Sequence, residues 1–132
     1  MKQVWVEFSA EEEKPLVFAA WVAKTPEQRG RGFQGVCPGL VTERSLLFVF
    51  PAPVKANFHM SGVALPLDIV FIDVFRQVIN IQRMALQESD RSTTYYRSDT
   101  VFQFALETAA GRLDQLRRNP RLWRMRVSNR NQ

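Results

Sequence analysis

Hydrophobic and polar positions alternate with the two-residue period of β-strands over much of the chain. Val4, Val6 and Phe8 fall on one face of such a segment, with Trp5 and Glu7 between them. Other segments are continuous runs of Val, Ile, Leu and Phe, which are typical of strands covered on both faces. About eight strands are predicted, at residues 4–8, 16–22, 46–50, 55–60, 67–73, 77–84, 100–106 and 122–127. The chain is therefore expected to be mainly β (α+β).

Two short helices complete the predicted set of elements. Thr25 is an N-cap, Pro26 suits the first helical position, and Gln28 completes a capping box, so a helix begins at Pro26. Glycines and prolines crowd the following residues, so this helix is short and residues 34–43 are predicted to form a loop. The second helix is predicted to begin with Thr108 as its cap and to end near Pro120.

The predicted hairpin of residues 67–84 has an unusual tip. Two-residue hairpin turns favour Asn-Gly or Asp-Gly, but Val74 and Phe75 stand there. Both side chains are expected to be exposed. Contact between two copies through this tip is one hypothesis, so we expect a monomer or a weak homodimer.

Composition restricts the class of protein. The chain has 132 residues, 45% hydrophobic and 23% charged, which is typical of one folded domain over residues 1–132. No apolar run approaches the ~20 residues of a membrane span, and no secretory signal is recognised, so a cytoplasmic location without membrane contact is expected. Cys37 is the single cysteine, which excludes an internal disulfide and a cysteine zinc cage. We expect no metal and no cofactor.

Positive charge is concentrated near the carboxyl end. Between Arg112 and Arg130 seven arginines face one acid, Asp114, a net charge of +6 within a total of +5. The rest of the chain therefore sums to −1. One hypothesis is that this segment binds nucleic acid or another polyanion through phosphate contacts. A structural explanation competes with this hypothesis. Arginines that point outward from an edge strand discourage edge-to-edge aggregation, and arginines at the carboxyl end of a helix interact favourably with the helix dipole. The arginines assigned to polyanion binding are Arg117, Arg118, Arg121, Arg124 and Arg126.

An ordered set of short motifs carries a family resemblance. The motifs are TPEQR at 25–29, RGF at 31–33, LFVFP at 47–51, FHM at 58–60, PLDIVFID at 66–73 and LE to AG at 106–111. Together they resemble the domain of unknown function 192 family of small prokaryotic proteins, over roughly residues 17–127. The resemblance implies a small, closed or nearly closed β-barrel with short helices packed on it. It implies no activity, because the family has no agreed one.

One segment departs from the family pattern. After the phenylalanine the family has tryptophan, methionine, lysine, asparagine and threonine, whereas this chain has His59, Met60, Ser61, Gly62 and Val63. The polar trio of the family is therefore absent here. Whether a family function is lost with it stays open.

The clustering of family-like residues indicates a working surface. We expect a non-catalytic small-ligand-binding or accessory module, whose partner is an unknown small ligand or protein. The candidate binding residues are Phe58, His59, Met60, Ser61, Asp68 and Glu107.

A small hydrolase is the second alternative. His59 could act as general base on the hydroxyl of Ser61, oriented by Asp68. This hypothesis requires the three side chains to converge in one open cleft. A lone histidine in a strand is more often structural, and Asp68 within an apolar run more often anchors a strand through hydrogen bonds. No residue is therefore assigned as catalytic.

Overall fold

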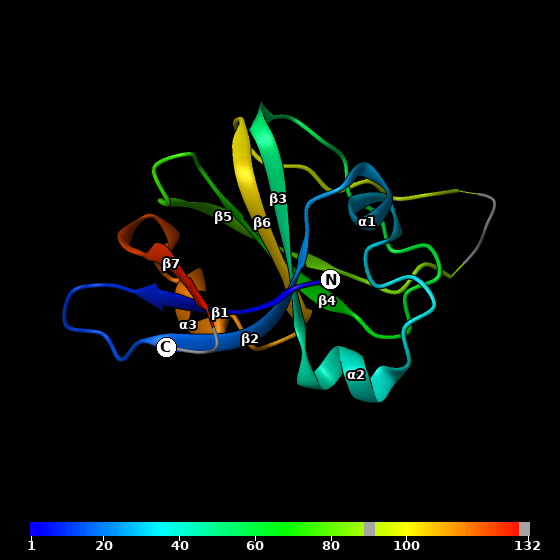
Figure 1. The fold of residues 1–132 in the computed structure, drawn as a ribbon, viewed down its shortest axis with the longest axis horizontal. Helices are drawn as coiled ribbons and strands as arrows, with labels where there is room; N and C mark the ends of the chain where they lie inside the picture. Colours follow the sequence, from blue (N-terminus) through cyan, green and yellow to red (C-terminus); the bar gives the residue numbers. More distant parts are fainter. Residues whose placement is uncertain (89–91, 130–132) are drawn as a thin grey trace.

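One curled sheet forms the body of the protein (Figure 1). The computed structural model describes residues 1–88 and 92–129. The strand order is β5-β4-β6-β3-β2-β1-β7, and every neighbouring pair is antiparallel except β2 and β3. The strands are β1 (Gln3–Ser9), β2 (Leu16–Ala23), β3 (Ser45–Val54), β4 (Leu67–Ile72), β5 (Val78–Met84), β6 (Phe102–Ala109) and β7 (Arg124–Asn129).

The sheet curls until its two edge strands meet at one end. The amide of Val78 donates to the carbonyl of Trp123 (3.0 Å), and the amide of Met125 donates to the carbonyl of Arg76 (2.8 Å). These bonds join the start of β5 to the start of β7. The result is a curled half-barrel, which confirms the mainly β, barrel-like prediction.

The described strands number seven, because residues 55–60 do not form the predicted eighth. Phe58 makes only a single bridge, in which its amide and carbonyl each bond the backbone of Tyr96 at 2.8 Å. The aromatic side chain of Phe58 is buried against Phe48 and Phe71. The buried side chains of Phe58 and Met60 therefore hold this segment together with the single bridge, and it has no ladder of strand hydrogen bonds.

The first predicted helix is confirmed and the others are corrected. Helix α1 (Pro26–Arg31) has the full capping box, with the amide of Gln28 donating to Thr25 Oγ1 at 3.1 Å. A second helix, α2 (Pro38–Glu43), stands within the predicted loop, because Val41 is buried in the core. Thr108 caps no helix: it lies in β6, where the hydroxyl of Ser45 donates to it at 3.0 Å. After it come α3 (Asp114–Arg117) and a single 3-10 turn, Pro120–Leu122.

Strand β4 separates two apolar clusters. Val70 and Ile72 pack with side chains of β1 and β7 on one face, whereas Leu67, Ile69 and Phe71 face the other cluster. Every residue of β4 is buried, as its apolar run predicts. The second cluster lies beneath α1, α2 and residues 56–63, and the candidate site opens from it.

The hairpin tip between β4 and β5 is exposed as predicted. Val74 is 46% and Phe75 is 74% accessible to solvent. The carboxylate of Asp73 accepts the amides of Phe75 and Gln77, both at 2.9 Å, and replaces the usual glycine-based turn. Self-association through the tip stays a prediction. Among the described helices, none has the length and apolar character needed to cross a bilayer.

Candidate functional site

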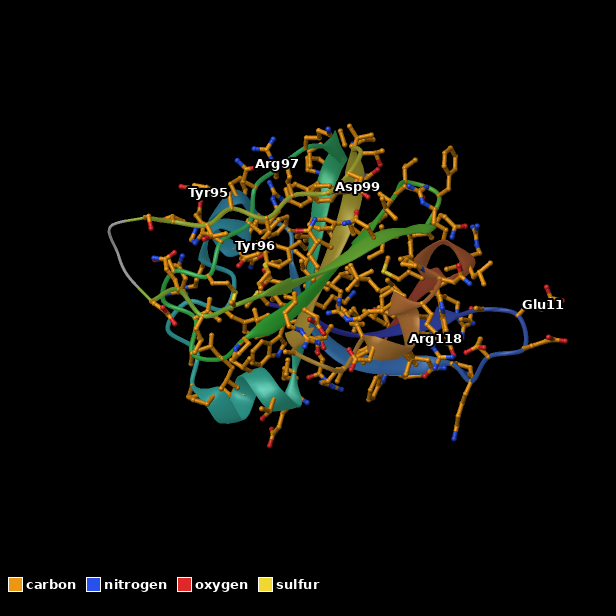
Figure 2. The ribbon with its side chains drawn as sticks, turned by 180° about the vertical axis from the view of Figure 1, so that it is seen from behind. Glu11, Tyr95, Tyr96, Arg97, Asp99 and Arg118 are labelled. Atoms are coloured by element: carbon orange, nitrogen blue, oxygen red, sulfur yellow. The ribbon has the colours of Figure 1, made fainter. Side chains whose placement is uncertain are left out.

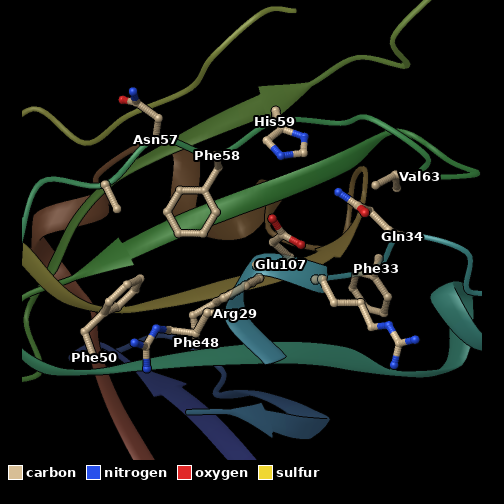
Figure 3. Close-up of a pocket in the computed structure, with 14 residues that line it drawn as sticks. Arg29, Phe33, Gln34, Phe48, Phe50, Asn57, Phe58, His59, Val63 and Glu107 are labelled. Carbon is tan, nitrogen blue, oxygen red and sulfur yellow. The ribbon is translucent and has the colours of Figure 1, made fainter. Parts of the chain in front are cut away.

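A pocket opens between α1 with the loop after it and residues 56–63, above β3 and β6 (Figure 3). Its volume is about 210 Å³. Its walls include the aromatic rings of Phe33, Phe48, Phe50 and Phe58, and Glu107 lies at its floor. The pocket therefore combines an apolar lining with one buried acid.

The two-residue period of β6 directs Glu107 toward this pocket. Ala105, two residues earlier, belongs to the cluster beneath the pocket. In the neighbouring strands the residues opposite Glu107 are Leu46 and Ile69, both buried and apolar. In Figure 3 the carboxyl group points toward the segment that carries Phe58 and His59. No charged residue stands opposite Glu107 in either adjoining strand.

Burial without a partner changes the acidity of Glu107. The residue is 4% exposed, and within residues 1–88 and 92–129 its carboxyl group has no hydrogen-bond or ion-pair partner. Desolvation raises its pKa from 4.5 to about 8. At neutral pH the group is therefore mostly a protonated acid, which can both donate and accept a hydrogen bond.

Gly32 brings the backbone close to this acid. It ends α1 with a φ of 52°, in the region that favours glycine. A β-carbon there would lie 3.6 Å from Phe48 Cζ and 3.9 Å from Glu107 Oε1. A side chain would therefore occupy space beside the carboxyl group, and glycine keeps that part of the pocket open.

Arg29 forms part of the wall with its donors already engaged. Its Nη1 donates to the carbonyl of Val49 at 3.1 Å and to the carbonyl of Lys24. Its guanidinium carbon lies 4.8 Å from the ring centre of Phe50, a cation–π contact. Arg29 thus ties α1 to β3 and fixes one side of the pocket.

His59 lies across the pocket from Glu107 (Figure 3). Its Nδ1 accepts the backbone amide of Ser61 at 3.2 Å, so the proton of the neutral ring is on Nε2. The ring edge also meets Tyr95, with centroids 6.3 Å apart. The imidazole is thereby held at the rim.

Comparison with family models decides which family the chain belongs to. The model of the domain of unknown function 192 family, described as Uncharacterized ACR, matches residues 7–120. The chain belongs to this family. The family resemblance noted in the sequence is thereby confirmed.

Solved structures similar to this family member share its fold. A candidate transcription regulator from Sinorhizobium meliloti 1021 has a TM-score of 0.81 and 21% identity, with 95% of this chain and 93% of that chain covered. A protein of unknown function from Novosphingobium aromaticivorans DSM 12444 has a TM-score of 0.80 and 23% identity, covering 94% and 84%. At these identities the likeness shows the fold alone. A search of curated proteins finds no match.

Motifs that carry the family resemblance converge on the pocket. Residues 25–33 supply Arg29 and Phe33, residues 47–51 supply Phe48, and residues 58–60 supply Phe58. Glu107 comes from a further motif. Of the predicted binding residues, Phe58, His59 and Glu107 line the pocket, while Met60 is buried in the cluster beneath it.

Several pocket residues were missed by the sequence analysis, although a signal for them existed. Arg29 and Phe33 belong to the first two family motifs, and Phe50 belongs to the third. Their convergence could not be predicted, because it depends on α1 folding back over β3.

Asp68, by contrast, lies away from the pocket. It is fully buried on the face of β4 opposite Leu67 and Ile69. Its carboxylate accepts Arg83 Nε (2.8 Å), Arg117 Nη2 (2.6 Å) and the amide of Gly111 (2.8 Å). Because these partners satisfy it, Asp68 acts as a structural anchor.

The constellation required for a hydrolase is therefore not formed. His59 and Ser61 contact each other only through the backbone amide of Ser61, and Asp68 contacts neither. The even–odd alternation of β4 turns Asp68 away from the cluster beneath His59. The described residues also contain no group of three or more acidic, His or Cys side chains placed to hold a metal ion.

Many of the carboxyl-terminal arginines hold internal contacts. Arg112 stacks over Phe18 at 4.9 Å, and burial lowers its pKa. Arg117 binds Asp68 and Asp114.

In β7 the arginines are also engaged. Arg124 Nη2 donates to the carbonyl of Phe75 at 2.8 Å, and Arg126 Nη2 donates to Glu7 at 2.8 Å. Arg118 and Arg121 are exposed, and Arg130 lies outside the described residues.

Trp123, Tyr95 and Tyr96 do not form an exposed aromatic surface beside these arginines. Trp123 is only 2% exposed, so its ring is not available to stack on a base. Figure 2 shows Tyr95 and Tyr96 well away from Arg118. An exposed aromatic residue that does lie beside these arginines is Phe75, whose carbonyl accepts Arg124 Nη2.

Proposed function

We propose that this protein is a non-catalytic module that binds a small organic ligand in the Glu107 pocket. The observation that carries the proposal is a buried carboxyl group that has no partner in residues 1–88 and 92–129 and is directed into a cavity with aromatic walls. A buried polar group is costly unless it is hydrogen-bonded. A ligand with a polar end and an apolar body would satisfy the acid and cover the rings.

The size of the cavity limits the ligand. At about 30 Å³ for each water molecule in the liquid, a volume of about 210 Å³ corresponds to roughly seven waters. This is below the 300–1,000 Å³ that is typical of drug-sized sites. The proposed ligand is therefore the size of a single substituted ring or a short branched chain.

Titration with benzyl alcohol tests the proposal. The ring suits the aromatic walls, and the hydroxyl can both donate to and accept from Glu107. Backbone amide signals in two-dimensional NMR are expected to shift saturably at residues 29–34, 57–63 and 105–108. The variant Val63→Phe fills the pocket and should abolish the shifts, whereas Val101→Phe, at an exposed position, should keep them. Shifts that survive Val63→Phe, or no saturable shifts in the parent protein, would reject the pocket as the site.

Nucleic-acid binding is a second candidate function. The net charge of +5 and the exposed Arg118 and Arg121 support it, and a structural neighbour is described as a candidate transcription regulator. The test is fluorescence anisotropy with labelled single- and double-stranded DNA at low and near-physiological salt. Tight binding that weakens with salt and is lost in an Arg118→Ala and Arg121→Ala double variant would support this function. No binding at low salt would exclude it.

A further inference from the structure

The two ends of the Glu107 pocket favour opposite charges on a ligand. At the floor is an acid without a partner. At the mouth is Arg31, which lines the pocket and is exposed. Within the described part of the chain, its guanidinium makes no ion pair or hydrogen bond. A ligand that reaches both residues therefore meets an acceptor inside and a donor outside.

The chemistry of the floor favours a cationic nitrogen. An ammonium group can donate to the carboxylate of Glu107, and hydrogen bonds between two charged groups are about twice as strong as those between neutral groups. The aromatic rings of Phe48 and Phe58, which pack edge to face with centroids 5.1 Å apart, supply faces that attract cations. A carboxylate on the ligand would instead be repelled whenever Glu107 is ionised.

The mouth disfavours a ligand that carries only positive charge. Arg29 and Arg31 both line the pocket, so a simple amine would meet two cations on its way in. The guanidinium of Arg29 donates to backbone carbonyls and stacks on Phe50. The guanidinium of Arg31 has no partner among the described residues, so its N–H groups can donate to a ligand. An anionic group on the ligand would pair with Arg31 and offset the repulsion.

We propose that the ligand is a small zwitterion with its charges at opposite ends, such as an ω-amino acid, with its ammonium group at Glu107 and its carboxylate at Arg31. This inference rests on the proposed ligand-binding function of the same pocket. It names the chemical class that the function alone leaves open.

Binding of the ammonium group is coupled to the loss of one proton. Glu107 releases its proton to solvent and becomes the carboxylate that accepts the ammonium N–H. The titratable and charged groups facing it in the pocket are Arg29, Arg31 and His59. The pKa of Glu107 in the folded protein without ligand is about 8. The affinity for the ammonium group therefore rises about tenfold per pH unit up to pH 8 and then levels off. At pH 7 about 0.9 proton is released for each ligand bound.

The experiment compares four probes that differ only at their two ends. Benzyl alcohol has neither charge, benzylamine has the ammonium, para-(hydroxymethyl)benzoate has the carboxylate, and para-(aminomethyl)benzoate has both. Isothermal titration calorimetry at pH 8 should give the tightest binding for the zwitterion. Replacing the hydroxyl by the ammonium should tighten binding about tenfold. Adding the carboxylate should tighten it about two- to fivefold, because Arg31 is exposed. Repeating the titration at pH 7 in buffers of different ionisation enthalpy counts the proton released.

Two variants assign each gain to its residue. Glu107→Gln cannot ionise, so the gain from the ammonium and the proton release should both disappear while benzyl alcohol still binds. Arg31→Gln should remove the gain from the carboxylate and, because one of the two cations is lost, should slightly tighten the binding of benzylamine. Arg121→Gln, which removes an exposed arginine away from the pocket, is the matched control and should change neither.

The outcomes distinguish the inference from the function beneath it. One contrary result is that benzyl alcohol binds and benzylamine binds no more tightly, and another is that the higher affinity of benzylamine persists in Glu107→Gln. Either result would refute the proposed zwitterion and leave the pocket as a binding site. If the carboxylate gain survives Arg31→Gln, the assignment of the mouth is wrong. If no probe binds, the proposed function itself fails.

Discussion

Replacing Glu107 by glutamine should stabilise the protein, and increasingly so as the pH rises. In the unfolded chain this carboxyl group loses its proton near pH 4.5, whereas in the folded protein it keeps it until about pH 8. Between these values the folded state binds one more proton than the unfolded state. The free energy of unfolding therefore falls as the pH rises through this window. Below pH 4.5 the penalty is absent, and above pH 8 it is complete.

The magnitude follows from the size of the pKa shift. Each unit corresponds to about 1.4 kcal/mol, so a rise from 4.5 to about 8 costs about 5 kcal/mol above pH 8. Glu107→Gln keeps the shape of the side chain and has no proton to lose. Relative to pH 5, the variant should therefore gain about 3.5 kcal/mol over the parent protein by pH 8. Because Glu107 is half ionised at pH 8, the difference should grow by only about 0.4 kcal/mol more by pH 9.

Guanidinium unfolding at pH 5, 6, 7, 8 and 9 measures this difference. Both proteins are followed by tryptophan fluorescence, with the slope of the unfolding free energy against denaturant as a check on two-state behaviour. Glu43→Gln, which removes an exposed carboxylate at the end of α2, is the matched control and should show no such trend. Parallel pH profiles for Glu107→Gln and the parent protein would refute the reasoning, because they would mean that the carboxyl group is solvated or paired.

Three further predictions concern stability and association. Asp68→Asn replaces the buried carboxylate that accepts Arg83 and Arg117 by an amide, whose NH2 group would face one of these donors, and should cost about 3 kcal/mol in urea unfolding; a loss below about 1 kcal/mol would contradict its role as an anchor. Thr25→Ala should cost about 1 kcal/mol and Thr25→Ser much less, and equal losses would argue against the side-chain cap. The double variant Val74→Ser and Phe75→Ser should change stability by less than about 0.5 kcal/mol. In sedimentation velocity it should also remove any dimer seen with the parent protein; a dimer that persists, or a parent protein that is monomeric throughout, would disprove association through the tip.

A destabilising residue at the pocket floor fits a binding role. A protein of this size has a total stability of roughly 5–15 kcal/mol, so a cost of about 3 kcal/mol at pH 7 is a large share of it. An apolar side chain or an amide at position 107 would avoid this cost. Packing alone therefore gives no reason for a carboxyl group at this position.

Features that depend on neighbouring residues could be predicted from the sequence. The capping box needs only Thr25 and Gln28, three residues apart, and it formed as expected. The alternation of Val4, Val6 and Phe8 placed all three in one cluster, and the apolar run of β4 indicated burial on both faces. In these cases the hydrogen bonds or the side-chain period lie within one short segment.

Elements that depend on distant residues were assigned less well. Residues 55–60 have a strand-like pattern, but Phe58 found a partner in Tyr96, beyond β4 and β5, and only one bridge formed. Thr108 has the side chain of a cap, but its hydroxyl bonds Ser45, 63 residues away. Burial of Val41 turned a predicted loop into α2. Contacts across the sheet outweighed local preference at each of these positions.

The sequence by itself determined the class of fold, the family, and the motifs that supply the pocket. Only the tertiary structure decided which candidates act together. Asp68 and Glu107 are both acids within apolar strands, and their sequence surroundings do not distinguish them. Asp68 forms ion pairs with Arg83 and Arg117, which lie 15 and 49 residues away along the chain and balance its negative charge. Glu107 faces a cavity with aromatic walls and has no partner among the described residues, so folding made one acid an anchor and left the other unpaired in that part of the chain.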